Sequence, residues 1–205
     1  MSSFYQRTTA PTVGDPYYTN VDFGGYNRCI VRDWSNGFVL PNCTGYAWGR
    51  FLECQGLTQC SLSTANASQW YSYSDGYARG QTPKLGAVAC WGGGAYGGAG
   101  HVAVVEQINQ DGSVILSESN YSGGIFQMRQ CDASMHLQSP YTFWFQGFIY
   151  PIVDFDGGGD PIDPPIPPDP EVEQKKRLIM LMMMYAKIKR EREEKTNGKY
   201  YKCIK

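Results

Sequence analysis

The sequence predicts an α+β fold for one domain, followed by a separate C-terminal part. The chain has 205 residues, of which 42% are hydrophobic and 14% aromatic, enough for one well-buried domain and an appendage. Glycine (24) and tyrosine (15) are frequent, whereas charged residues make up only 18%. This composition favours short strands and many turns over a helical bundle.

Three regions follow one another along the chain. We expect a catalytic domain over residues 1–155, a Gly/Pro-rich linker over 156–170 and a basic, Met-rich helical tail over 171–205. Residues 1–170 hold 7 Lys+Arg against 14 Asp+Glu, net −7, and residues 171–205 hold 11 against 5, net +6. The acidic domain argues against a nucleic-acid enzyme, because phosphate contacts require a basic surface.

Two helices are predicted in the first half of the domain. Apolar residues recur at helical spacing from Cys43 to about residue 54, after an extended Pro41-Asn42 entry, so Cys43 lies at the N-terminus of that helix. A second short helix is expected over 64–73, capped by Ser63 or Thr64. Runs of β-forming residues then predict an antiparallel sheet flanked by these helices, with strands over 87–91, 102–108, 114–119 and 142–150.

The turn between the second and third strands decides which side chains share a face. A four-residue loop over 109–112 puts His101 opposite Asn120 and Ala103 opposite Glu118. A two-residue loop keeps the same parity, whereas a three-residue loop separates these groups onto opposite faces. Two of the three loops therefore gather His101, Glu118 and Asn120 on one surface.

Cys43 lies at the start of a predicted helix, and His101 lies next to the predicted strand over 102–108. A thiol attacks a carbonyl as thiolate, which a helix N-terminus and a neighbouring histidine favour. We expect Cys43 to be the nucleophile and His101 the base that later protonates the leaving amine. Glu118 or Asn120 would orient the imidazole, and which of the two does so stays open.

Further residues complete the expected site. The backbone N–H of Cys43, with Asn42, would form an oxyanion hole, and Gly100 would let a substrate backbone approach the histidine. The seven cysteines show no metal-ligand spacing, and five of them are interpreted as core residues (29, 54, 60, 90 and 131). Arg50 is interpreted as a structural hydrogen-bonding residue.

Four sequence blocks together resemble a CHAP domain, a papain-like amidohydrolase related to NlpC/P60: Asn-Cys-Thr-Gly-Tyr-Ala-Trp-Gly-Arg from residue 42, Pro-Lys-Leu-Gly-Ala-Val-Ala-Cys-Trp from 83, Gly-His-Val-Ala-Val-Val-Glu-Gln-Ile from 100 and Ser-Glu-Ser-Asn-Tyr from 117. The resemblance implies the papain-like CHAP fold and cleavage of peptidoglycan, at the N-acetylmuramoyl-L-alanine amide or at a peptide bond. It implies Cys43, His101, Glu118 and Asn120 as site residues. Asp22 and Asp33 are isolated, so no metal or cofactor is expected.

The biological setting is predicted from the same resemblance. We expect a phage lysin of a Gram-positive host, kept in the host cytoplasm until it is released to the wall, because the N-terminal residues form no signal peptide. The alternatives are a lysin on a virion tail, a virion structural or assembly protein with a CHAP fold, and a bacterial cell-wall remodelling enzyme. The apolar run of the tail, over 178–186, is too short for a bilayer, so self-association, membrane or wall attachment, and virion docking stay open for it.

Overall fold

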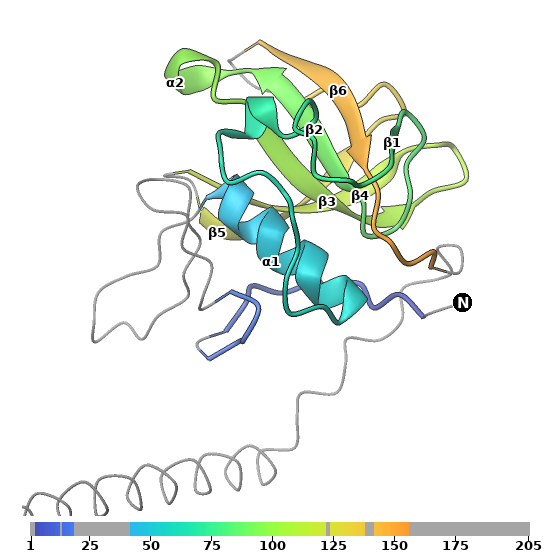
Figure 1. Cartoon of the computed structure of the whole chain (residues 1–205). Coiled ribbons are helices and arrows are strands. Elements are labelled where there is room, and N and C mark those ends of the chain that lie inside the picture. The colour runs from blue at the N-terminus through green and yellow to red at the C-terminus, as the bar shows by residue number, and fades with distance from the viewer. Residues whose placement is uncertain (1–2, 13, 19–41, 122–123, 138–141, 156–205) are drawn as a thin grey trace, which may run out of the picture. The chain divides into compact units, whose positions relative to one another are not determined.

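A six-stranded antiparallel sheet lies at the centre of the part of the chain that the computed structural model describes, residues 3–12, 14–18, 42–121, 124–137 and 142–155. The strand order is β1-β6-β2-β3-β4-β5. Helix α1 lies across one face of this sheet (Figure 1). The elements in chain order are α1 (Cys43–Gln55), η2 (Ala67–Gln69), β1 (Arg79–Gly80), β2 (Val88–Gly93), α2 (Ala95–Gly98), β3 (His101–Ile108), β4 (Val114–Asn120), β5 (Gly124–Cys131) and β6 (Phe143–Ile149).

The first predicted helix and the four predicted strands are confirmed as α1, β2, β3, β4 and β6. The predicted helix over 64–73 is wrong, since only the 3₁₀ turn η2 forms there. Local hydrogen bonds hold this segment in turns: the Ser63 hydroxyl accepts from the Ala65 amide, and the Trp70 indole donates to the Ala65 carbonyl. Strands β1 and β5 and the short helix α2 were not predicted.

Both ends of α1 are fixed by local hydrogen bonds. Asn42 is the N-cap, and its side-chain oxygen accepts from the Thr44 amide at 3.0 Å and the Thr44 hydroxyl at 2.7 Å. Gly56 ends the helix in the left-handed conformation, with φ 64°, and donates its amide back into the last turn. These caps fix which residue begins the helix, and that residue is Cys43.

The apolar side of α1 packs on the middle of the sheet. Ala47 and Phe51 from the helix share a buried cluster with Val88, Val102 and Val104 from β2 and β3. Fully burying one such side chain stabilises the fold by about 1.5 to 3 kcal/mol. This packing holds the N-terminus of α1 at a defined place above the sheet.

Five residues, 109–113, separate β3 from β4, and the Asn109 amide donates to the Ser113 carbonyl at 2.8 Å, so the turn itself has three residues, 110–112. Ile108 therefore lies opposite Val114, and the expected four-residue loop is wrong. A three-residue loop alone would separate the predicted site residues onto opposite faces of the sheet.

A β-bulge at Glu106 reverses that effect. The register shifts by one residue between Val105 and Gln107, so Glu106 is an extra residue in β3. On the far side of the bulge Val104 lies opposite Ser117. If this register continues to the ends of the strands, His101, the first residue of β3, lies opposite Asn120, the last residue of β4. The expected pairing of the site residues therefore arises from a loop and a bulge whose shifts compensate.

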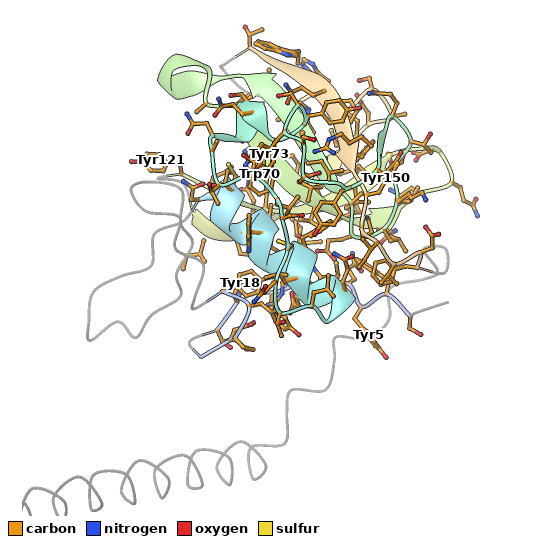
Figure 2. All side chains as sticks on the ribbon, in the orientation of Figure 1. Tyr5, Tyr18, Trp70, Tyr73, Tyr121 and Tyr150 are labelled. Carbon is orange, nitrogen blue, oxygen red and sulfur yellow. The ribbon has the colours of Figure 1, made fainter. Side chains whose placement is uncertain are left out.

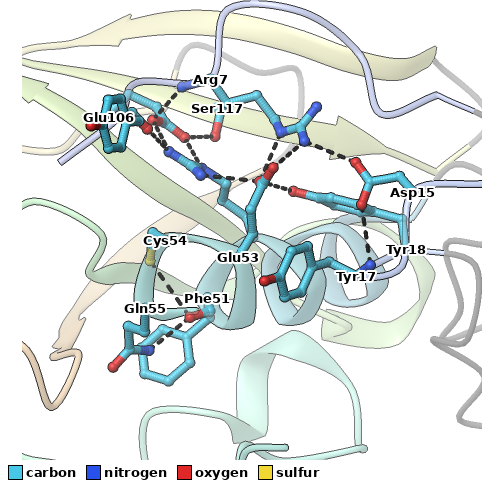
Figure 3. Close-up of polar contacts among 12 residues, drawn as sticks. Arg7, Asp15, Tyr17, Tyr18, Phe51, Glu53, Cys54, Gln55, Glu106 and Ser117 are labelled. Carbon is cyan, nitrogen blue, oxygen red and sulfur yellow. Dashed lines mark hydrogen bonds and ion pairs between the residues drawn. The ribbon is translucent and has the colours of Figure 1, made fainter. Parts of the chain in front are cut away.

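Buried hydrogen bonds hold the bulged residue in place (Figure 3). Arg50 of α1 donates from Nε and Nη2 to the two oxygens of Glu106 at 2.7 and 2.8 Å. The Ser117 hydroxyl and the Arg7 amide donate to the same carboxylate at 2.6 and 2.9 Å. Arg50 and Glu106 are each 2% exposed, so every charge of this pair is satisfied within the protein.

The N-terminal segment joins the same network. Arg7 donates to Glu53 of α1 at 2.8 Å and to Asp15 at 3.0 Å, and the Tyr18 hydroxyl donates to Glu53 at 2.9 Å (Figure 3). The described part of this segment thus packs on α1. It anchors the face of the helix that also carries Arg50.

The predicted linker and helical tail lie outside the described residues. Among the described residues, no helix is long and apolar enough to cross a bilayer.

Candidate active site

Cys43 is the first residue of α1 and is half-buried. The Asn42 side chain caps the Thr44 amide, one residue further along. The amides of the first helical turn have no partner within the helix and carry the positive end of its dipole. The thiol therefore lies where a negative sulfur or a nearby oxyanion is stabilised. Asn42, expected to help form an oxyanion hole, uses its side-chain oxygen as the helix cap.

His101 is the first residue of β3 and only 8% exposed. It lies directly opposite Trp91 of β2. Its ring contacts the Trp91 ring at a centroid distance of 5.9 Å and the Phe143 ring at 6.2 Å. These aromatic neighbours limit the rotation of the imidazole and exclude water from two of its sides.

The two ring nitrogens of His101 have different partners. Nε2 lies 2.6 Å from Oε2 of Glu118, and the side chain of Cys43 forms a second hydrogen bond with the ring. Because Nε2 is engaged by the carboxylate, Nδ1 is the nitrogen left for the sulfur. The structure thus brings together three of the four predicted residues from α1, β3 and β4.

These contacts control the charge of the pair. Burial alone would lower the pKa of His101, but its hydrogen bonds with Cys43 and Glu118 outweigh burial and raise the pKa to about 10. Burial would likewise raise the pKa of Glu118, but the hydrogen bond and charge of His101 and the charge of Arg129 lower it to about 2. At neutral pH the pair is imidazolium and carboxylate.

Asn120, the fourth predicted residue, is placed differently. It is the half-buried last residue of β4 and lies opposite Gly124 of β5. In the described part of the chain, no hydrogen bond joins its side chain to His101. Tyr121 follows it and projects, 38% exposed, from the end of the domain where α1 begins (Figure 2). Glu118 is therefore the residue that contacts the imidazole.

Two residues of β5 contact Glu118, and the sequence did not predict either of them as a site residue. Arg129 donates from Nε to Oε1 of Glu118 at 2.7 Å, with Nη2 at the same distance, and Gln127 donates to the same oxygen. The Gln127-Met128-Arg129 alternation, read as a strand paired with β4, could have placed both on the Glu118 side. The strand itself was not predicted, so its side chains were not assigned.

Gly100 has a different role from the one expected. Its φ is 78°, and a Cβ at this position would lie 2.3 Å from the Ser68 amide nitrogen and 2.5 Å from the Trp91 carbonyl oxygen. The space beside Gly100 is therefore filled by the protein backbone and is not open to a substrate. The glycine permits the chain to enter β3 closely packed against the η2 segment.

No group of three or more Cys, His, Asp or Glu residues within the described ranges is arranged to hold a metal ion. The five described cysteines are free thiols. Burial raises the pKa of Cys54 to about 12 and of Cys60 to about 11, and raises the pKa of Cys90 further. These thiols are therefore protonated at neutral pH. Cys90 and Cys131 are buried, as expected for core residues, whereas Cys54 and Cys60 are half-buried and Cys29 lies outside the described residues.

The charge state of His101 predicts a pH dependence of folding stability. Its pKa is raised from 6.5 to about 10 on folding, so its contribution is complete below about pH 6.5 and is lost as pH rises toward 10. The pKa of Glu118 falls from 4.5 to about 2, so its contribution is present above about pH 4.5 and is lost as pH falls toward 2.

Denaturant unfolding of Cys43→Ala and of the double variant Cys43→Ala/His101→Gln across pH measures these contributions, because the sulfur that contacts His101 is absent from both proteins. Above pH 6.5 Cys43→Ala should lose stability relative to the double variant by up to about 1.4 kcal/mol per pH unit. Parallel curves for the two proteins would contradict the assignment of an ion pair at His101.

Comparison with known proteins gives a family match and several relatives. Residues 33–120 match the family model of the CHAP domain. The matched segment contains Cys43, His101, Glu118 and Asn120. The match confirms that this segment resembles the CHAP domain.

Particular relatives come from Staphylococcus aureus. The chain is 33% identical over 110 residues to the probable autolysin SsaALP, covering 53% of this chain and 40% of the relative. It is 32% identical over 98 residues to the probable autolysin LDP (48% and 34%) and 36% identical over 111 residues to the staphylococcal secretory antigen SsaA (53% and 40%). The chain thus spans about two fifths or less of the length of these relatives.

Among solved structures, the chain is similar to an N-acetylmuramoyl-L-alanine amidase from Staphylococcus aureus. The sequences are 30% identical, the match covers 52% of this chain and 30% of the amidase, and the TM-score is 0.38.

Proposed function

We propose that this protein is a peptidoglycan hydrolase that cleaves an amide bond of the bacterial cell wall through a cysteine thioester. One observation carries the proposal: the thiol at the start of α1 contacts an imidazole whose other nitrogen is bonded to a buried carboxylate. A nucleophile, a base and a group that orients the base are the elements of covalent acyl transfer. The CHAP match and the autolysin relatives support peptidoglycan as the substrate.

In the first half of the reaction, the Cys43 sulfur as thiolate attacks the carbonyl carbon of the scissile amide. The carbonyl oxygen becomes an oxyanion near the amides at the start of α1, where the helix dipole stabilises it. The His101 imidazolium then gives its proton to the leaving amine, and the carbon–nitrogen bond breaks. The products are a thioester on Cys43, a free amine and a neutral imidazole.

In the second half, neutral His101 takes a proton from a water molecule, and the resulting hydroxide attacks the thioester carbon. The carbon–sulfur bond breaks, the acid product leaves, and the thiolate and imidazolium are restored. Glu118 stays ionised throughout, fixes the imidazole orientation and stabilises its positive form. Asn120, at the end of β4, is proposed to contact the substrate or the solvent side of the site.

The test is digestion of purified peptidoglycan, including that of Staphylococcus aureus, with mass spectrometry of the released fragments. We expect the wild type to solubilise at least one Gram-positive peptidoglycan and Cys43→Ala to solubilise none. A new N-terminal alanine identifies an N-acetylmuramoyl-L-alanine amidase, and new ends within the stem or cross-bridge identify an endopeptidase. Absence of fragments from a broad panel would contradict the proposal and favour the structural or assembly role.

The biological setting is a further proposal: a phage lysin that stays in the host cytoplasm until it reaches the wall. The four motifs and the division into an acidic domain, a Gly/Pro-rich segment and a basic tail support it. The names of the relatives instead favour a second candidate, a bacterial autolysin. Detection of the protein in purified virions, in phage lysates or in uninfected cells separates a virion lysin, an endolysin and an autolysin.

A further inference from the structure

We propose that Arg129 and Gln127 of β5 are positioning residues that hold the Glu118 carboxylate in the orientation required by His101. The two residues do not contact the sulfur, and their effect on the reaction passes through Glu118. The activity part of this proposal rests on the proposed function. The placement of the carboxylate does not depend on it.

The donors around Glu118 divide cleanly between its two oxygens. Oε1 accepts from Nε of Arg129 at 2.7 Å, with Nη2 also at 2.7 Å, and from the Gln127 side chain. Oε2 faces Nε2 of His101 at 2.6 Å. Because the β5 donors occupy one oxygen, the carboxylate cannot rotate without breaking these bonds, and its other oxygen stays aimed at the imidazole.

The strand register explains why both side chains reach the same oxygen. Gln127 lies directly opposite Glu118, and Arg129 lies opposite Leu116, two residues away on the same side of β4. The Glu118 side chain is fully buried, whereas that of Arg129 is 30% exposed. The guanidinium thus covers the carboxylate from the solvent side of the sheet.

The charge of Arg129 keeps the buried carboxylate ionised. A buried carboxylate with a single cationic partner tends to take up a proton, because burial penalises its charged form. With Arg129 present, Glu118 has a cation on each oxygen. The described titratable groups that interact with this carboxylate are His101 from β3 and Arg129 and Cys131 from β5. Cys131 is kept neutral by a pKa that burial raises to about 11. Cys43 of α1 contacts the His101 ring.

Three variants separate charge from geometry. Arg129→Gln removes the charge, whereas Arg129→Lys keeps the charge but cannot donate from two nitrogens. Gln127→Met removes the neutral donor and keeps a side chain of similar size. Lys84→Gln is the control, because Lys84 forms an exposed ion pair with Asp154 at 3.0 Å. Thermal unfolding establishes that each variant is folded before it is compared.

The decisive readout is the protonation of Glu118, seen through the ring nitrogens of His101 by NMR. The chain has two histidines, and exposed His136 is the internal reference. In Arg129→Gln, the pH at which the His101 ring nitrogens report protonation of Glu118 should rise by at least about one unit, toward the ordinary pKa range of a carboxyl group. Arg129→Lys should retain most of the wild-type position. An unchanged transition in Arg129→Gln overturns the proposal.

Activity provides the second readout. In Arg129→Gln, the acid limb of the kcat/KM profile should move upward with the NMR transition, and kcat/KM near neutral pH should fall by about 10- to 100-fold. A merely structural effect lowers kcat/KM equally at all pH values and leaves the acid limb in place, which would contradict the proposal. If the wild type digests no peptidoglycan, the proposed function fails, and the NMR titration still decides the role of Arg129.

Discussion

Replacing Cys43 with alanine should lower the rate of peptidoglycan cleavage by at least about 10³-fold. The sulfur is the atom that forms the covalent bond in the proposed reaction, and no other described thiol contacts His101. The expected loss is in kcat, because the substitution removes the reaction path and leaves most substrate contacts in place. The measurement is the initial rate of fragment release at saturating substrate.

The fold should survive this change. Cys43 is half-buried at the first position of α1, where alanine is a favourable helix residue, and the Asn42 cap does not involve its side chain. The matched control is Cys54→Ala, a half-buried cysteine near the other end of the same helix. Cys54→Ala should keep near wild-type activity at a temperature where it is folded. Equal losses in the two variants would contradict the role of Cys43.

Replacing Glu106 with glutamine should destabilise the domain by about 3 to 5 kcal/mol, because it removes the buried counter-charge of Arg50 and leaves it only the half-buried Glu53 carboxylate at 3.0 Å. Denaturant unfolding measures the loss. Because Glu106 is also the bulged residue of β3, activity should fall in the protein that remains folded. Asp154→Asn, which breaks an exposed ion pair, is the control and should cost less than about 1 kcal/mol.

A double variant tests whether the cost comes from the lost buried counter-charge. Arg50→Met combined with Glu106→Gln also removes the cation that has lost its buried partner, and it should be more stable than Glu106→Gln alone. A double variant that is less stable by the sum of the two single losses would show that the network stabilises the fold in another way. In either case, the activity of the double variant reports whether the bulge persists without the ion pair.

The start of α1 and the strands that carry His101 and Glu118 could be predicted because their signals are local. The Asn42 cap precedes an apolar helical repeat, and the β3 and β4 segments are runs of β-branched residues on either side of a turn. The first helix and four strands are confirmed within one or two residues. The predicted helix over 64–73 failed because short side-chain hydrogen bonds outweighed its weak helical pattern.

The register between β3 and β4 could not be derived from local signals alone. The loop has the length that separates His101 from Glu118, and the bulge at Glu106 restores their shared side. The bulge is fixed by Arg50, which lies 56 residues earlier in the chain. The prediction that the site residues share a surface was therefore right for a reason that the sequence did not show.

The side chains around Glu118 were missed for a similar reason. Strand β5 is mostly half-buried, with Gln127, Arg129 and Gln130 in its second half, and gives a weak strand signal. Its importance becomes visible only when β4 is known to pair with it. The roles of Cys43, His101, Glu118 and Asn120 in catalysis, and the helix expected over 171–205, stay predictions.

The central claim is that Cys43 forms a thioester with the acyl part of a cell-wall amide. The most direct measurement is intact-protein and peptide mass spectrometry after a soluble peptidoglycan fragment is mixed with excess enzyme and quenched in acid. We predict an adduct with the mass of the acyl fragment on the peptide that contains Cys43, absent from Cys43→Ala. Release of the same products by Cys43→Ala at the wild-type rate, or an adduct on another residue, would contradict the account.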